Sequence, residues 1–209
     1  MNLAALQLDR DLPSGLAVYS APAAEPITTA TAKNHLRVDS DVSDDDTLID
    51  ALVTAARMHV EDVCGLALIT QTLDWYLEAF PSSGEIWLPR SPAASVTSIS
   101  YTDQDDAVTT VSAATYALVS VARPPKVVLK YGQLWPFDPL QAGLPVKVRY
   151  VAGFGAAGSS VPRPLLQAML LLIGHWYENR EAVIDTGRKT LLPVPLAVDS
   201  LLFPYRVWQ

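Results

Sequence analysis

The stretch Val146–Tyr177, VKVRYVAGFGAAGSSVPRPLLQAMLLLIGHWY, joins two patterns of different period. In VKVRYVA, apolar residues alternate with other residues, which is typical of a half-buried strand. Between Leu165 and Ile173 only Gln167 is polar, which is typical of a helix that is buried on nearly every side. The sequence therefore predicts a strand that ends at a glycine-rich loop and continues into a long apolar helix.

The loop GFGAAG (153–158) has the bare pattern G-x-G-x-x-G of a dinucleotide-binding turn. That fingerprint needs a helix that starts within the motif, so that its amide groups face the pyrophosphate. Here Pro162 and Pro164 place the helix start near residues 162–165, after the glycines. The acidic residue about 20 positions on, Glu178, falls inside the helix and does not end a second strand. We therefore expect a flexible hinge loop, and a small nucleotide-binding or hydrolytic enzyme that uses GFGAAG stays the alternative function.

Working outward, helical spacing predicts a short helix over 29–38 and a longer one that starts after Ser43 as N-cap and ends at Gly65. Period-two patterns predict strands at 70–79, 85–88, 95–101, 108–111, 116–121, 126–131 and 146–151. The predicted fold class is α+β: a small helical core of about three helices, interrupted by an antiparallel β region, with an extended C-terminal tail. The expected parts are an N-terminal arm (1–26), a helical core (27–69 and 161–184), a β-rich insertion (70–160) and the tail (185–209).

Composition limits the class of protein. Half of the 209 residues are hydrophobic, which is enough for a sizeable core. The formal charge of −7 disfavours a sequence-reading DNA-binding protein, because phosphate attraction is missing. One cysteine, Cys64, suits a reducing cytoplasm. We expect a soluble protein without a signal peptide or membrane contact, since the longest uncharged helical run, Pro164–Tyr177, is shorter than the roughly 20 residues of a bilayer span.

Candidate chemical sites are weak. Asp39, Asp41, Ser43, Asp45 and Asp50 have spacings loosely like a calcium loop, but Asp44 stands where the sharp turn needs glycine. A pairing of Cys64 with His59 or His175 rests on residue type alone, and a carbohydrate-binding β module would rest on Trp75, Trp87 and Trp135. We therefore predict no catalytic residue, no metal site and no cofactor, and not an enzyme.

The apolar helix and the C-terminal segment point instead to protein contacts. Four residues lie beside the helix's main stripe and widen it beyond what one small domain covers: Leu166, Leu170, Ile173 and Tyr177. We expect them at a subunit interface, with Gly174 allowing another backbone to approach closely. The segment from Thr190 is too apolar for a solvated tail, and its prolines prevent one long helix. Either it folds back on its own domain or it docks on another protein.

The order of these features resembles the bacteriophage head–tail connector, or adaptor, proteins of the HK97 type, in the longer branch found in prophages and gene transfer agents. The resemblance rests on a succession of soft patterns: ITTATAKNHLRVD (27–39), DDDTLIDALVTAARMHVEDVCGLALITQTLDW (44–75), YVAGFG (150–155), VPRPLLQAMLLLIGHWYENRE (161–181) and LLFPYR (201–206). The shortest members are almost wholly helical, so the β region here is a departure from them.

The resemblance implies a structural protein of the virion, or phage-like particle, neck. It would form a homo-oligomeric ring, a 12-mer in the particle, beneath the capsid portal. The ring would extend the DNA channel without sequence-specific binding and join the head to a downstream stopper or tail-side connector. By the LLFPYR match, portal contact would fall on Leu201, Leu202, Phe203, Pro204, Tyr205 and Arg206.

Overall fold

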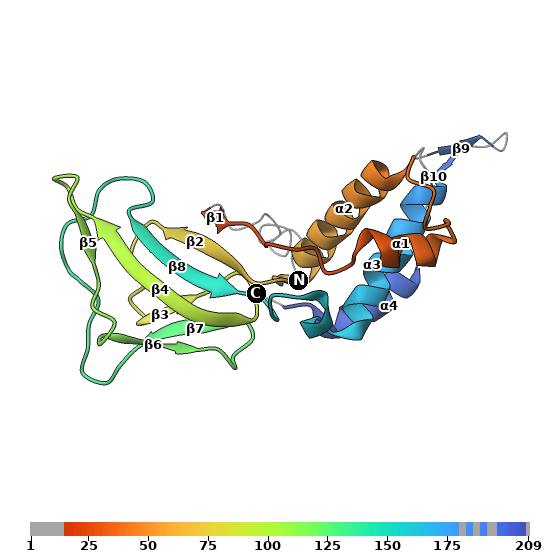
Figure 1. The fold of residues 1–209 in the computed structure, drawn as a ribbon. Coiled ribbons are helices and arrows are strands. Elements are labelled where there is room, and N and C mark those ends of the chain that lie inside the picture. The colour runs from red at the N-terminus through yellow and green to blue at the C-terminus, as the bar shows by residue number, and fades with distance from the viewer. Residues whose placement is uncertain (1–14, 180–182, 186–188, 192–195, 208–209) are drawn as a thin grey trace. The chain divides into compact units, whose positions relative to one another are not determined.

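The computed structural model describes residues 15–179, 183–185, 189–191 and 196–207. The chain forms two compact units, each built from separate segments (Figure 1). The β unit comprises 1–23, 65–154 and 207–209, and the helical unit comprises 24–64 and 155–206. The chain therefore passes between the units near residues 23, 64, 154 and 206.

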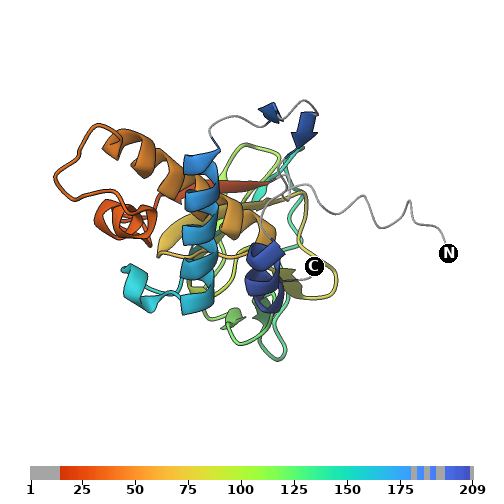
Figure 2. The same ribbon diagram turned by 90° about the vertical axis from the view of Figure 1, so that its right-hand side faces the viewer.

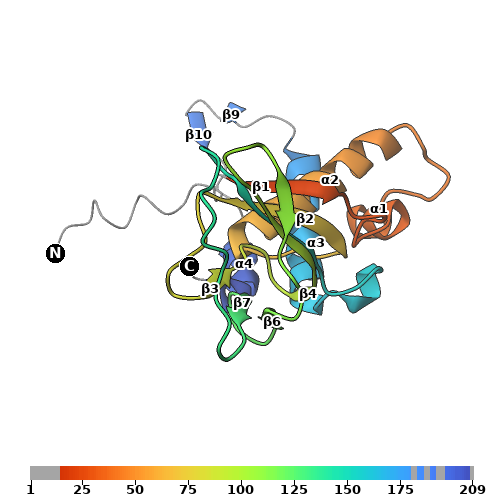
Figure 3. The ribbon, with the colours of Figure 1, turned by 90° about the vertical axis from the view of Figure 1, so that its left-hand side faces the viewer.

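Two antiparallel sheets make up the β unit (Figures 1 and 3). The five-stranded sheet has the order β1-β2-β8-β4-β5, from β1 (Leu16–Ser20), β2 (Gln71–Leu77), β8 (Val146–Ala152), β4 (Ala93–Thr102) and β5 (Val108–Thr110). The three-stranded sheet has the order β3-β7-β6, from β3 (Glu85–Trp87), β7 (Lys126–Leu129) and β6 (Tyr116–Val119). The predicted strands are confirmed, with shifted ends.

β8 lies at the centre of the larger sheet and pairs along its length with both β2 and β4. Its inward residues, Val146, Val148, Tyr150 and Ala152, are fully buried, while the residues between them are partly exposed. This row belongs to one core that also holds Val127 of the smaller sheet. The alternation read from VKVRYVA thus describes a strand with one face in the core.

The outer face of the larger sheet carries a charged pair. Asp74 on β2 is 4% exposed and accepts two 2.7 Å hydrogen bonds from the Arg149 guanidinium on β8. Arg149 also stacks on the ring of Tyr19, at 3.3 Å from its centroid. Tyr19 lies in β1, a strand that the sequence did not predict, within the segment expected as an arm. Most side chains of β1 are exposed, so its sequence shows no clear alternation of apolar and polar residues. Backbone pairing with β2 holds this strand in the sheet.

In the helical unit, the central element is α3 (Arg163–Glu178), which contacts α1 (Thr29–Leu36), α2 (Asp46–Cys64) and α4 (Leu196–Leu202) (Figure 2). Its buried residues recur at helical spacing: Leu165, Ala168, Met169, Leu172 and Ile173. Among the described residues this unit also has two short 3₁₀ turns (Gly158–Ser160 and Phe203–Tyr205) and an antiparallel strand pair, β9 (Val183–Asp185) with β10 (Lys189–Leu191).

Local capping residues account for the start of α1 and the end of α2, but not for the start of α2. Thr28 caps α1 by accepting a 3.2 Å hydrogen bond from Thr31 N, and Gly65, with φ of +65°, follows the end of α2 as expected. α2 begins at Asp46, however, and not directly after Ser43. The buried ammonium of Lys33 holds the intervening loop, since it donates to the Val42 carbonyl at 2.5 Å and pairs with Asp46 at 2.8 Å.

The predicted α+β class is confirmed, but the C-terminal segment is less extended than expected. Within the described part of 185–209, α4 forms two helical turns, and its Val198 and Leu202 are buried. Prolines at 195 and 204 bracket this helix, so they prevent a long helix but permit a short one. The described residues therefore contain four α-helices where about three were expected.

At Gly153, Gly155 and Gly158, close packing leaves no room for a Cβ atom. The expected hinge in this loop stays a prediction. Gly153 has φ of +136°, and a Cβ there would lie 2.5 Å from Thr70 N. A Cβ on Gly158 would overlap the Pro26 carbonyl oxygen. Residues 153–154 therefore belong to the β unit and 155–158 to the helical unit, each held against its own neighbours.

We predict that Gly153→Ala lowers the free energy of unfolding of the β unit by about 3 kcal/mol or more, because backbone strain and a backbone overlap act together. The matched control is Gly132→Ala, since Gly132 has φ of +74° with nothing within 4 Å of its would-be Cβ. Strain alone should cost the control about 1–2 kcal/mol. Denaturant unfolding followed by circular dichroism measures the free energy of unfolding of both variants. If both lose the same amount of stability, the overlap at Gly153 adds nothing to the backbone strain, and the prediction is wrong.

Candidate functional site

The Cys64 side chain lies in the core of the helical unit. It is fully buried at the end of α2, and its thiol donates to the Leu202 carbonyl at 3.9 Å. Burial raises the pKa of Cys64 to about 11, so the thiol is protonated at neutral pH. A protonated, buried thiol is a poor nucleophile.

The histidines do not complete a catalytic pair with Cys64. His59 meets the ring of Trp176 edge-on at 6.0 Å between centroids. The Nε2 atom of His35 lies 3.4 Å from the position of a Cβ on Gly174. The close neighbour of Gly174 is thus a side chain, and the expected approach of another backbone is wrong for this chain alone. Within the described ranges, no hydrogen bond joins Cys64 to His59 or His175.

Two of the five candidate calcium-loop residues, Asp45 and Asp50, are partners of other side chains. Asp45 accepts a 2.6 Å hydrogen bond from the Tyr177 hydroxyl, and Asp50 accepts a 2.5 Å one from Thr29. Among the residues that the structure describes, no group of three or more His, Cys, Asp or Glu side chains could hold a metal ion. The calcium-loop spacing therefore corresponds to helix and loop contacts.

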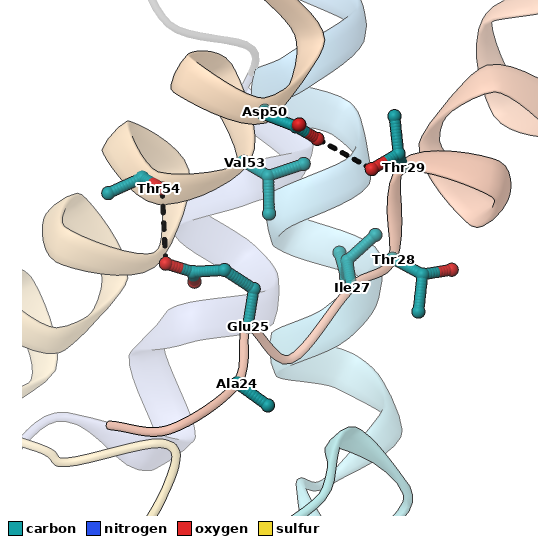
Figure 4. A pocket seen from close by; sticks show the side chains of 8 residues that line it. All are labelled: Ala24, Glu25, Ile27, Thr28, Thr29, Asp50, Val53 and Thr54. Carbon is teal, nitrogen blue, oxygen red and sulfur yellow. Dashed lines mark hydrogen bonds between the residues drawn. The ribbon is translucent and has the colours of Figure 1, made fainter. Parts of the chain in front are cut away.

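A hollow of about 470 Å³ lies between α2 and the segment before α1 (Figure 4). Ile27 and Val53, both buried, contribute its apolar lining. Its acidic groups are already paired: Glu25 accepts from Thr54 at 3.1 Å and from Arg57 at 2.8 Å, and Asp50 accepts from Thr29. With its carboxylates so engaged, the hollow presents no free acid or base for a reaction.

The GFGAAG loop lacks the geometry of a nucleotide site. α3 begins at Arg163, after Pro162, so the last glycine of the loop precedes the helix by several residues. A 3₁₀ turn, Gly158–Ser160, fills the interval. The first amide groups of α3 therefore do not face the glycines, as a bound pyrophosphate would require.

The three tryptophans of the β unit do not share one exposed platform. Trp135 is 6% exposed and stacks on Phe80, with centroids 5.2 Å apart. Trp87 is half exposed beneath the Lys126 ammonium, and Trp75 is partly buried against the core. This arrangement does not favour carbohydrate stacking.

The expected interface residues of α3 differ in their exposure. Leu166 and Leu170 are partly exposed, whereas Ile173 is fully buried inside the helical unit. Tyr177 is partly exposed and held by its hydrogen bond to Asp45. In this conformation the Ile173 side chain is not available to a neighbouring subunit, because it packs within its own.

The expected portal-contact residues also fall into two groups. Leu202 is 1% exposed and belongs to the core, while Phe203 is 63% exposed and Pro204 is exposed beside it. Leu201, Tyr205 and Arg206 are intermediate, and Arg206 pairs with Asp199 at 2.9 Å. The 3₁₀ turn Phe203–Tyr205 therefore presents the accessible apolar surface of this motif.

Sequence reasoning missed one apolar surface. The connection between β7 and β8 exposes four large apolar side chains: Tyr131, Leu134, Phe137 and Leu144. Its signal in the sequence was a run of aromatic and aliphatic residues in a long connection between strands. The sequence pattern alone does not tell whether such side chains are buried or exposed.

No helix among the described residues is both long and apolar enough for a bilayer span. None of the curated proteins matches the chain.

Known structures and a family model identify the chain's relatives. Similar chains occur in the neck of an empty gene transfer agent particle computed with C6 symmetry (TM-score 0.78) and in the neck of a native particle computed with C12 symmetry (TM-score 0.73). A third occurs in the virion of a native gene transfer agent particle (TM-score 0.76). Each is 27% identical, and each match covers 93% of this chain and 96% of the other.

The model of the head completion protein family matches residues 26–189, which include both the helical core and the β region. This match spans most of the chain, and the neck structures agree with it over nearly the whole length. The resemblance to a structural head–tail connector is thereby confirmed, and the chain belongs to the head completion protein family.

Proposed function

We propose that this protein forms a ring in the neck of a virion or phage-like particle, beneath the portal, where it extends the DNA channel and joins the head to the next connector. The observation that carries the proposal is the near full-length likeness to a neck component, at 27% identity and a TM-score of 0.78. The family match supports it independently over residues 26–189.

The proposed ring has twelve copies. Neck structures of the similar chains were computed with C6 and with C12 symmetry, and a twelvefold ring contains sixfold symmetry. A closed cyclic ring needs two different faces on each copy, since one face meets the other face of the next copy. Leu166 and Leu170 on α3 are our candidates for one of these faces, because both are apolar and partly exposed.

The accessible part of the LLFPYR motif is our candidate for portal contact. Phe203 and Pro204 are exposed, and the buried Leu202 fixes the turn that carries them. An exposed aromatic side chain on an anchored turn is typical of an interface hot spot.

The charge of the chain fits a passage for DNA. Asp39, Asp41 and Asp44 are exposed on the loop between α1 and α2, and the formal charge of the chain is −7. If this loop lines the channel, it repels phosphates and lets DNA move without retention.

We infer that the protein works through contacts and does not catalyse a reaction. A protonated Cys64, the paired carboxylates of the hollow and the packed glycines support this inference.

For portal contact, we predict that Phe203→Ser weakens binding to the purified portal ring at least about tenfold, because it removes an exposed aromatic anchor. Met58→Ser is the matched control, since Met58 is a comparably exposed apolar residue of the same unit on α2. Surface plasmon resonance measures both variants. Equal affinity of the Phe203 variant and the unchanged chain would remove this turn from the portal contact.

For ring formation, Leu166→Asp combined with Leu170→Asp should prevent the chain from completing a ring on the portal, because two charges would be desolvated in the contact. Gln167→Asp places one negative charge on an exposed position of α3 and should leave the ring intact. Negative-stain microscopy reads the outcome, with circular dichroism to establish that the helices persist. Complete rings from the folded double variant would contradict the assignment.

For the enzyme alternative, equilibrium dialysis with NAD, FAD and ATP at about 1 mM should detect no binding, because the α3 amide groups do not face the glycines. Saturable binding that is lost in Gly155→Ala would restore the nucleotide site and overturn the inference.

A further inference from the structure

The connection Tyr131–Leu144, which we name the apolar loop, exposes more apolar surface than its position requires. Tyr131 is fully exposed, Phe137 is 84% exposed, Leu134 66% and Leu144 43%. Single exposed apolar residues are ordinary, but a group on one loop marks a contact surface.

The apolar loop is anchored to the β unit. Between its exposed side chains, Trp135 turns inward and stacks on Phe80 at 13° between the ring planes, with Tyr116 6.5 Å away. The Tyr101 hydroxyl donates to Asp138, and Gln141 N donates to the Thr102 carbonyl at 3.1 Å. These contacts order the loop in advance, so that binding would lose little conformational entropy.

One border of the apolar loop is acidic, whereas Lys130 stands at its N-terminal end. Leu140 forms a β-bridge with Asp103, so the loop runs beside the turn between β4 and β5 (Figure 1). That turn contains Asp103, Asp105 and Asp106, and Asp106 accepts from the Gln141 side chain. Nucleic acid and anionic membranes would be repelled here, whereas a protein face with an apolar centre and a basic border would be attracted.

The same loop of a second copy is a poor match for this surface. Two equivalent loops would bring two acidic borders together, and like charges across an interface disfavour association. The partner chemistry therefore differs from that of the loop itself.

We propose that the apolar loop docks the tail-side connector of the same particle, through a face of that protein that is apolar at its centre and basic at its border. This inference rests on the proposed function, in which a head–tail connector needs a second docking surface besides the portal contact. The portal candidate, Phe203, belongs to the helical unit, whereas the apolar loop belongs to the β unit. The two contacts therefore lie on separate parts of the chain and can be lost separately.

The experiment uses full-length protein assembled on the portal ring, with the purified tail-side connector of the same particle as the probe. Leu134→Ser combined with Phe137→Ser should lower affinity for the connector at least about tenfold, while ring assembly and portal binding stay unchanged. Asp105→Lys should also weaken the complex, because it reverses a charge at the border. Asp105 suits this test since the described hydrogen bonds of the turn use its backbone amide and not its carboxylate.

The matched control is Val18→Ser. Val18 is 59% exposed on β1, at the opposite edge of the five-stranded sheet from β5, and its replacement should leave connector binding unchanged. Thermal melting of each variant establishes that the β unit stays folded.

Each other outcome overturns the proposal in a recognisable way. Unchanged connector binding by the folded double variant would exclude the loop as the docking site. Loss of ring assembly would make the loop a contact between copies, and loss of portal binding would make it part of the portal contact. Failure of the unchanged chain to assemble on the portal would contradict the proposed function itself.

Discussion

The position of β8 is the constraint on which the rest of the structure depends, because this strand is paired along both edges and buried on one face. β8 pairs with β2 on one side and with β4 on the other, and its inward row enters the core shared by both sheets. At Gly153, packing against residues 69–70 leaves no space for a Cβ; the chain leaves the β unit after Phe154 and continues into α3. One continuous stretch thus supplies the central strand of one unit and the central helix of the other.

The surfaces that we propose as contacts lie away from these packed centres. The Cys64 thiol is buried, Glu25 in the hollow is paired with Arg57, and the glycines of the GFGAAG loop are closely packed. The two accessible apolar surfaces proposed as contacts lie on anchored turns: the 3₁₀ turn at Phe203 in the helical unit and the apolar loop in the β unit. In both, buried neighbours such as Leu202 and Trp135 hold exposed side chains in place. This is the arrangement expected of a protein that acts by docking.

Much of the fold was predictable from local pattern. The alternation in VKVRYVA, the helical spacing from Leu165 and the glycine after Cys64 predicted β8, α3 and the end of α2, because each reflects short-range geometry. β1 was not predictable, since its place depends on pairing with β2 and on the contact between Tyr19 and Arg149. The start of α2 was missed for a similar reason, since Lys33 holds the preceding loop from another helix.

For the candidate surfaces, the sequence by itself determined which side chains are apolar and that the chain has an acidic balance. It also determined the succession of patterns that identifies the family. The tertiary structure alone decided exposure: Ile173 and Leu202 are buried while Leu170 and Phe203 remain accessible, and Trp135 turns inward between the exposed Leu134 and Phe137. The physical reason is that hydrophobicity belongs to a residue, whereas burial depends on segments that are distant along the chain and meet only after folding.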